Sequence, residues 1–187
     1  MISNGPNGYN QPIRNPNRLP KKALRNRFMH LAPFTEEDYP LLIDWIPDEE
    51  FCMFWAGPVY TWPLTPEQIR CHQKKQEINA FVPVENNQKI GFIEIVKISD
   101  REVRLSRVLI RRASDRGKGY GKTLVELAVD HARTRFNAKR VSLAVFEHNG
   151  QAIRCYTSLG FKIISREEKS RRFNGEWWPL LRMDKRV

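Results

Sequence analysis

The stretch DRGKGYGKT, residues 115–123, places three glycines among basic residues where strand-like sequence gives way to helix-like sequence. A nucleotide P-loop would need glycine at Arg116, and a dinucleotide fingerprint would need glycine at Lys122. What remains is a turn containing Arg116, Gly119 and Gly121 that opens a helix, where backbone N–H groups and the helix dipole attract an anion. The alternative is a tight turn that carries its glycines by chance.

The elements around this turn follow from hydrophobic periodicity and from cap and turn residues. They predict one strand, two helices, three strands, a helix, a strand, a helix and two strands: 27–34, 35–46, 65–78, 80–85, 89–98, 102–111, 120–136, 140–146, 150–159, 160–168 and 176–183. Residues 47–64 are predicted to be irregular or short-helical. Asn86-Asn87 and Asn174-Gly175 indicate hairpin turns. This order favours a mixed α/β (α+β) sheet covered by helices.

Composition indicates one globular domain with a basic leading segment. Six of the eleven net positive charges lie in residues 1–27, which also hold six asparagines and four prolines and no acidic residue. We interpret residues 1–26 as a flexible, solvated segment in preference to a nucleic-acid or membrane anchor, and residues 27–187 as the domain. No apolar run approaches the roughly 20 residues of a membrane span. Three cysteines without metal-ligand spacing and four scattered histidines favour a reducing cytoplasm and no metal site.

A second motif lies 28 residues beyond Gly121, where Asn149, Ala152, Tyr156 and Gly160-Phe161 follow the strand at 140–146. Together with the glycine turn, it resembles the acetyl-coenzyme A dependent N-acetyltransferases of the GNAT superfamily. The resemblance implies a single GNAT-like domain with a mostly antiparallel seven-stranded sheet whose strands 4 and 5 splay apart. It also implies direct acetyl transfer to a primary amine of a small molecule or of a protein or peptide, with aminoglycosides, polyamines, amino acids and protein lysines all open as acceptors. It is compatible with a homodimer.

The resemblance assigns the acetyl-coenzyme A site to the turn and to the neighbouring strand. Backbone groups and charges of the turn would hold the pyrophosphate, the strand before it would bond the pantetheine arm, and an asparagine would both cap a helix and touch that arm. The implied residues are Val108, Leu109, Ile110, Arg116, Gly117, Lys118, Gly119, Tyr120, Gly121, Lys122, Thr123, Asn149 and Tyr156.

The resemblance makes Tyr156 the general acid that returns a proton to the departing thiolate. The alternative is a packing tyrosine that shares a helix face with Ala152. Glu94 and Glu147 are the two candidates for the general base, each acting through water, and the alternative for each is an exposed glutamate with no catalytic role. Ala144 occupies the position of a glutamate in relatives that acetylate ribosomal-protein N-termini, which argues against a peptide N-terminus as acceptor.

The resemblance also implies that the variable region between the first and third predicted strands helps to form the acceptor site, through its aromatic residues. These are Trp45, Phe51, Phe54, Trp55, Tyr60 and Trp62, with Trp177-Trp178 of the last strand expected to face the same side. Aromatic walls suit an apolar side chain or an ammonium group, although most of these rings could instead be core. A rival function, a non-catalytic domain that binds acetyl-coenzyme A or associates with nucleic acid, remains open from the sequence.

Overall fold

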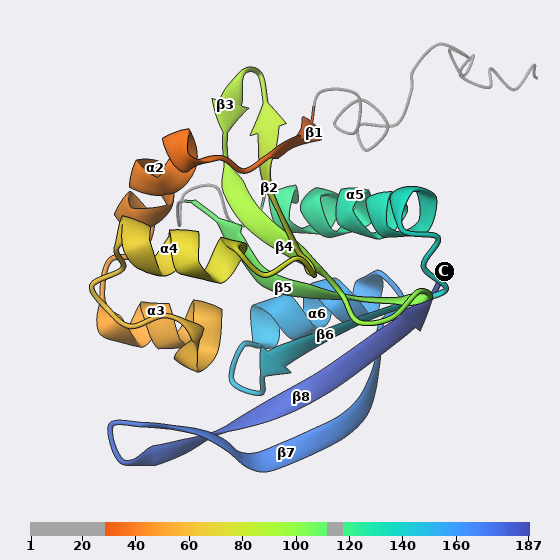
Figure 1. The fold of residues 1–187 in the computed structure, drawn as a ribbon. Coiled ribbons are helices and arrows are strands. Elements are labelled where there is room, and N and C mark those ends of the chain that lie inside the picture. Colours follow the sequence, from red (N-terminus) through yellow and green to blue (C-terminus); the bar gives the residue numbers. More distant parts are fainter. Residues whose placement is uncertain (1–28, 112–117) are drawn as a thin grey trace, which may run out of the picture.

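A computed structural model describes residues 29–111 and 118–187 (Figure 1). The strands are β1 Met29–Pro33, β2 Ile78–Glu85, β3 Gln88–Lys89, β4 Gly91–Lys97, β5 Glu102–Ile110, β6 Arg140–Phe146, β7 Lys162–Phe173 and β8 Glu176–Arg186. The helices are α2 Tyr39–Asp44, α3 Glu49–Ala56, α4 Pro66–Gln73, α5 Tyr120–Arg135 and α6 Gly150–Ser158, with 3-10 turns η1 Glu36–Asp38 and η2 Gly57–Val59. The predicted elements occur in the predicted order, with two differences: α3 forms within residues 47–64, which were predicted to be irregular or short-helical, and the strand predicted at 89–98 is divided into β3 and β4.

The sheet has the order β1-β2-β4-β5-β6-β8-β7, with β3 paired to β2. Its strands pair antiparallel except for the parallel pair β5 and β6. The described chain therefore has eight strands where seven were predicted, since β3 and β4 are separate. The break lies opposite Pro83, which has no N–H to donate to the ladder.

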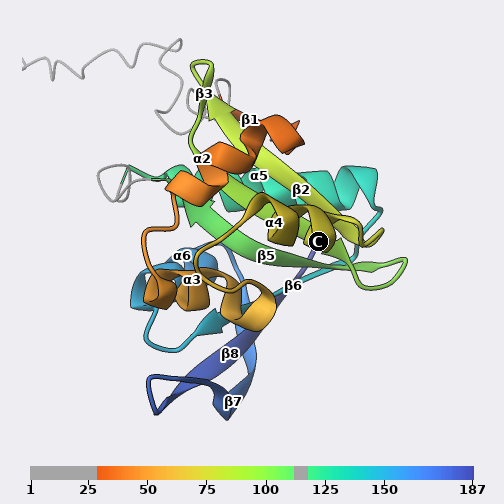
Figure 2. The same cartoon turned by 60° about the vertical axis from the view of Figure 1, so that its left-hand side comes forward.

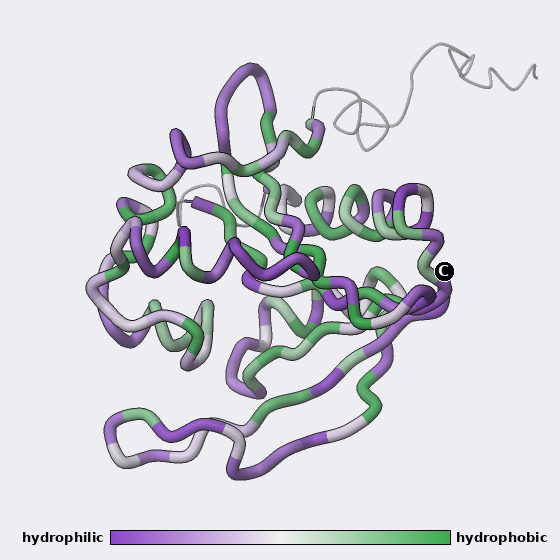
Figure 3. The backbone as a smooth tube through the Cα atoms, in the orientation of Figure 1, coloured by the Kyte–Doolittle hydropathy of each residue, from purple (hydrophilic) through white to green (hydrophobic). Residues whose placement is uncertain are grey.

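Helices cover both faces of the sheet. Figures 1 and 2 show α2, α3 and α4 together on one side, with α5 and α6 on the other. Two buried clusters match this arrangement, one containing Ile93, Leu105 and Leu124, and the other containing Phe92 and Leu109. Figure 3 shows hydrophilic residues along much of the edge strand β7. Charged side chains on an edge strand disfavour its pairing with a strand of another molecule.

Local signals explain several element boundaries. Asp48 caps α3 by accepting a hydrogen bond from the N–H of Phe51 at 2.7 Å. Asn86 and Asn87 both have positive φ, as do Asn174 and Gly175, so both predicted hairpins form. None of the helices that the structure describes is long and apolar enough to cross a membrane.

The parallel strands β5 and β6 separate partway along their length. Their paired residues run from Glu102 with Arg140 to Leu105 with Leu143. Beyond that point β5 continues against β4 up to Ile110, while β6 continues against β8. The splay predicted between the fourth and fifth strands is therefore confirmed, at β5 and β6.

Candidate active site

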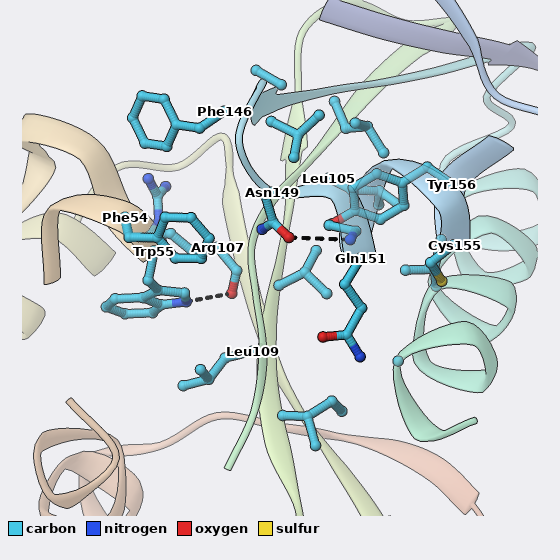
Figure 4. A pocket seen from close by; sticks show the side chains of 18 of the residues that line it. Phe54, Trp55, Leu105, Arg107, Leu109, Phe146, Asn149, Gln151, Cys155 and Tyr156 are labelled. Carbon is cyan, nitrogen blue, oxygen red and sulfur yellow. Dashed lines mark hydrogen bonds between the residues drawn. The ribbon is translucent and has the colours of Figure 1, made fainter. Parts of the chain in front are cut away.

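A cavity of about 500 Å³ occupies the opening between β5 and β6 (Figure 4). It is lined from α3, β5, the start of α5, β6, α6 and β8, and therefore reaches both faces of the sheet. Its lining residues are Phe51, Phe54, Trp55, Leu105, Arg107, Val108, Leu109, Ile110, Gly119, Gly121, Lys122, Val125, Leu143, Ala144, Val145, Phe146, Asn149, Gln151, Ala152, Cys155, Tyr156, Ser158 and Leu180.

The described part of the glycine turn, which begins at Lys118, lies at one end of this cavity. Gly119 has a φ of 87°, a left-handed conformation that glycine adopts readily, and its carbonyl accepts the first hydrogen bond of α5 from Thr123 at 3.1 Å. Gly121 and Lys122 line the cavity beside it. A helix N-terminus with a lysine at the cavity wall suits an anion, so the residues present fit the phosphates of a nucleotide-like ligand.

Not every predicted cofactor residue lies at the cavity. Val108, Leu109, Ile110, Gly119, Gly121, Lys122, Asn149 and Tyr156 line it, whereas Lys118, Tyr120 and Thr123 are not among the lining residues. Arg116 and Gly117 lie outside the described residues.

A β-bulge shapes the wall that β5 contributes. Phe92 faces Leu109 across the β4–β5 ladder and Glu94 faces Ser106, so β5 carries one extra residue between these pairs. Arg107 lies in this bulge with a φ of 52°, a conformation that is uncommon for a residue with a side chain.

The bulge also reverses which side chains face which side of the sheet. Leu105 packs into the cluster under α5 and α6, whereas Leu109, four residues later, packs into the cluster under α2, α3 and α4. Side chains four apart on a regular strand would share a face. The backbone carbonyl of Arg107 is held by the indole N–H of Trp55, at 2.9 Å (Figure 4).

Beside the cavity, Arg107 belongs to a buried cluster of three polar side chains. Its guanidinium forms an ion pair with Glu94 and lies 2.9 Å from Nε2 of His72, which is 3.2 Å from Oε2 of Glu94. The side chains of Glu94 and His72 are 0% and 7% exposed, and that of Arg107 is 10% exposed. Burial alone would raise the pKa of Glu94, but hydrogen bonds from His72 and Arg107 outweigh it and hold the pKa below its ordinary value.

The two candidate general bases therefore have different surroundings. Glu94 is fully buried, so the expectation of an exposed glutamate is wrong for this residue. Glu147 is exposed, and its carboxylate accepts two hydrogen bonds from Arg166 at 2.7 and 2.8 Å. Neither carboxylate is among the lining residues, although Arg107 links Glu94 to the cavity wall.

Asn149 and Tyr156 stand on the opposite wall, at the start and near the end of α6 (Figure 4). The side-chain oxygen of Asn149 accepts a hydrogen bond from the N–H of Ala152 at 3.1 Å, so the predicted helix cap is confirmed. Tyr156 is 8% exposed, and burial raises its pKa above the ordinary value. A tyrosine hydroxyl is protonated at neutral pH even at its ordinary pKa of about 10, so Tyr156 meets that requirement of a general acid. Burial also raises the pKa of the neighbouring Cys155 thiol.

An aromatic wall closes the end of the cavity formed by α3. Of the aromatic residues singled out from the sequence, Phe51, Phe54 and Trp55 line the cavity. Tyr60 is buried and stacks on Trp55 with ring centroids 5.7 Å apart, whereas Trp62 is exposed.

From β8, Trp178 and not Trp177 reaches the aromatic wall. Its ring lies 6.4 Å from that of Phe54 and 5.2 Å from that of Phe146, both edge to face. Trp177 is exposed, as expected for a neighbour whose side chain leaves the opposite face of the strand.

Sequence reasoning missed Arg107, Gln151 and the β6 side chains among the lining residues. Within residues 29–111 and 118–187, no group of three or more His, Cys, Asp and Glu side chains could hold a metal ion.

A mixed sheet that opens between two parallel strands, with a glycine turn at one end of the opening and a capped helix along its wall, defines an acetyltransferase type of fold. The model of the acetyltransferase (GNAT) family matches residues 42–161, and the chain belongs to this family.

Two curated relatives show partial similarity. Spermidine N(1)-acetyltransferase of Escherichia coli strain K12 is 29% identical over 112 residues, which are 60% of this chain and 60% of that protein. Spermine/spermidine N(1)-acetyltransferase of Bacillus subtilis strain 168 is 37% identical over 60 residues, 32% of this chain and 37% of that protein. The chain thus spans 60% or less of the length of these relatives.

A solved structure resembles the whole fold. The crystal structure of spermidine N-acetyltransferase from Vibrio cholerae in complex with CoA and spermine has a TM-score of 0.73 and 20% sequence identity. The similarity covers 86% of this chain and 96% of that one. It establishes that the two chains share a fold.

Proposed function

We propose that this protein is an N-acetyltransferase that moves the acetyl group of acetyl-coenzyme A directly to a primary amine. The observation that carries the proposal is one cavity, in the opening between β5 and β6, that has the glycine turn at one end, an aromatic wall at the other and Tyr156 on its side. Family membership supports the same reaction. The curated relatives act on spermidine or spermine by name, which supports an amine acceptor.

In this proposal the two ends of the cavity hold the two substrates. Backbone N–H groups at the start of α5 and the ammonium of Lys122 hold the phosphates of the cosubstrate. The edge of β5 beyond Leu105, which has parted from β6, offers backbone groups to the pantetheine arm around Val108 to Ile110. The acceptor amine enters from the aromatic wall.

The protein then orients the two substrates and supplies a proton for direct acetyl transfer. The neutral amine nitrogen attacks the thioester carbonyl carbon, a C–N bond forms, and the C–S bond breaks. The departing thiolate takes the hydroxyl proton of Tyr156, the proton that the amine nitrogen loses passes to solvent, and Tyr156 regains a proton from solvent. A backbone N–H at Leu109 or Ile110 stabilises the carbonyl oxygen as it gains charge.

Calorimetric titration with acetyl-coenzyme A, followed by a thiol-release assay over a panel of primary amines, tests this function. We expect micromolar binding that Lys122→Glu weakens, and amine-dependent release of coenzyme A. Tyr156→Phe should lower kcat by about 10²–10⁴-fold while leaving the affinity for acetyl-coenzyme A unchanged. Binding without release for any amine would instead support the non-catalytic alternative, and absence of binding would refute the proposal.

A further inference from the structure

The acceptor end of the cavity is a fixed aromatic wall. The Trp55 ring is held by the hydrogen bond from its indole N–H to the carbonyl of Arg107 and by stacking on Tyr60. The Phe54 ring lies 6.3 Å from that of Phe146 and 5.3 Å from that of His148. Rings held on several sides keep an open apolar surface available to a ligand.

The described lining of the cavity contains no carboxylate. In the described chain, the ionisable side chains that line the cavity are Arg107, Lys122, Cys155 and Tyr156. The last two are neutral at pH 7, since burial raises the pKa of each. The ion pair with Glu94 compensates the charge of Arg107. Lys122 belongs to the glycine turn at the other end.

Carboxylates close in sequence to the wall lie outside the lining of the cavity. Glu147, next to Phe146, forms an ion pair with Arg166. Glu49 and Glu50, which precede Phe51 in the first turn of α3, are exposed. A second ammonium group of an acceptor would therefore meet no carboxylate among the described residues that line the cavity.

These surroundings favour an acceptor with one positive charge. An aromatic face attracts one ammonium group through the negative charge on the face of its π system. Removing a further ammonium from water without a partner costs more than such a contact returns, so each additional buried charge on the acceptor opposes binding.

We propose that the acceptor is a primary amine with a single positive charge on an apolar or aromatic body, in contrast to the polyamines named for the curated relatives. This inference rests on the proposed acetyl transfer and specifies the acceptor at the same site.

A pair of acceptors tests the inference on the unmodified protein. With acetyl-coenzyme A saturating, we expect kcat/KM in the thiol-release assay to be at least about 10-fold higher for phenethylamine than for spermidine, because spermidine must desolvate additional charges. A higher value for spermidine would overturn the inference while leaving the proposed function intact. No release with any amine would refute the proposed function, and this inference with it.

Two variants test whether the wall sets this preference. Phe54→Glu places a carboxylate in the wall and should raise the spermidine-to-phenethylamine ratio of kcat/KM by about 10-fold. Trp177→Glu makes the same substitution at an exposed aromatic residue outside the lining and should leave the ratio unchanged. An equal shift in both variants, or none in a folded Phe54→Glu protein, would overturn the assignment. The wild-type comparison stands on its own if Phe54→Glu does not fold.

Discussion

Replacing Glu94 with glutamine should strongly destabilise the fold, because it removes the negative charge from a buried cluster. The carboxylate is 0% exposed, and its partners Arg107 and His72 are 10% and 7% exposed at the side chain. Removing one partner of a buried ion pair costs about 3–5 kcal/mol. With a urea dependence of about 2 kcal/mol per M, the midpoint of unfolding should fall by roughly 1.5–2.5 M.

Urea unfolding at pH 7, followed by tryptophan fluorescence and circular dichroism, measures this effect. Glu147→Gln is the matched control, because Glu147 also forms an ion pair with an arginine but at the exposed surface. Such pairs contribute little, so its midpoint should stay within error of the wild type. A Glu94→Gln midpoint that falls no further than that of Glu147→Gln would refute the reasoning.

The same comparison should depend on pH in a defined direction. The pKa of Glu94 is depressed in the folded protein, so its contribution to stability is fully present above the unfolded glutamate value of about 4.3. It is lost as the pH falls through the lower, folded value. The stability gap between the wild type and Glu94→Gln should therefore narrow as the pH is lowered below about 4. A stability difference that does not change with pH would contradict the assignment of this stability to the ionised Glu94 carboxylate.

Three further predictions concern the cavity walls. Asn149→Ala removes the cap of α6 and should lower the free energy of unfolding by about 1 kcal/mol in the same titration, whereas Asn149→Asp should retain most of it. Gly91→Ala would place a Cβ 2.1 Å from the carbonyl oxygen of Leu109, so we expect a displaced cavity edge and weaker acetyl-coenzyme A binding by calorimetry. Cys155 should be alkylated more slowly than the exposed Cys71, and acetyl-coenzyme A should slow it further; mass spectrometry of the labelled peptides checks both.

The order of elements could be predicted from the sequence because its signals are local. Asn174-Gly175 forms a hairpin turn because both residues adopt a positive φ, and Asn149 caps a helix through its own side chain. Neither signal depends on distant parts of the chain. Helix α3 also has a start signal in the sequence, the Asp48 cap followed by two acidic residues. The prolines and aromatic residues around it obscured that signal. The separation of β3 from β4 depends on Pro83 on another strand, so only the pairing reveals it.

The site residues that belong to a sequence motif could be predicted, whereas those whose position depends on tertiary contacts could not. Asn149 and Tyr156 lie on the cavity wall, as the resemblance to the family motif implied. Arg107 lies at the cavity because a β-bulge shifts the alternation of side chains along β5. No residue type in that strand indicates the bulge. For Glu94, the alternation of side chains along β4 does not show whether the carboxylate faces water or a buried partner. Its partners Arg107 and His72 lie 13 and 22 residues away in sequence.

The separation of β5 and β6 has a consequence for how the protein withstands heat. The ladder β1 to β5 and the ladder β6 to β8 meet through four residue pairs, so the sheet is weakest where the cavity lies. A molecule that bonds along β5 and packs against β6 would complete the sheet like an added strand. At a hundred times its dissociation constant it would add about 2.7 kcal/mol to the free energy of unfolding. The melting temperature would then report how much of that molecule the solution contains.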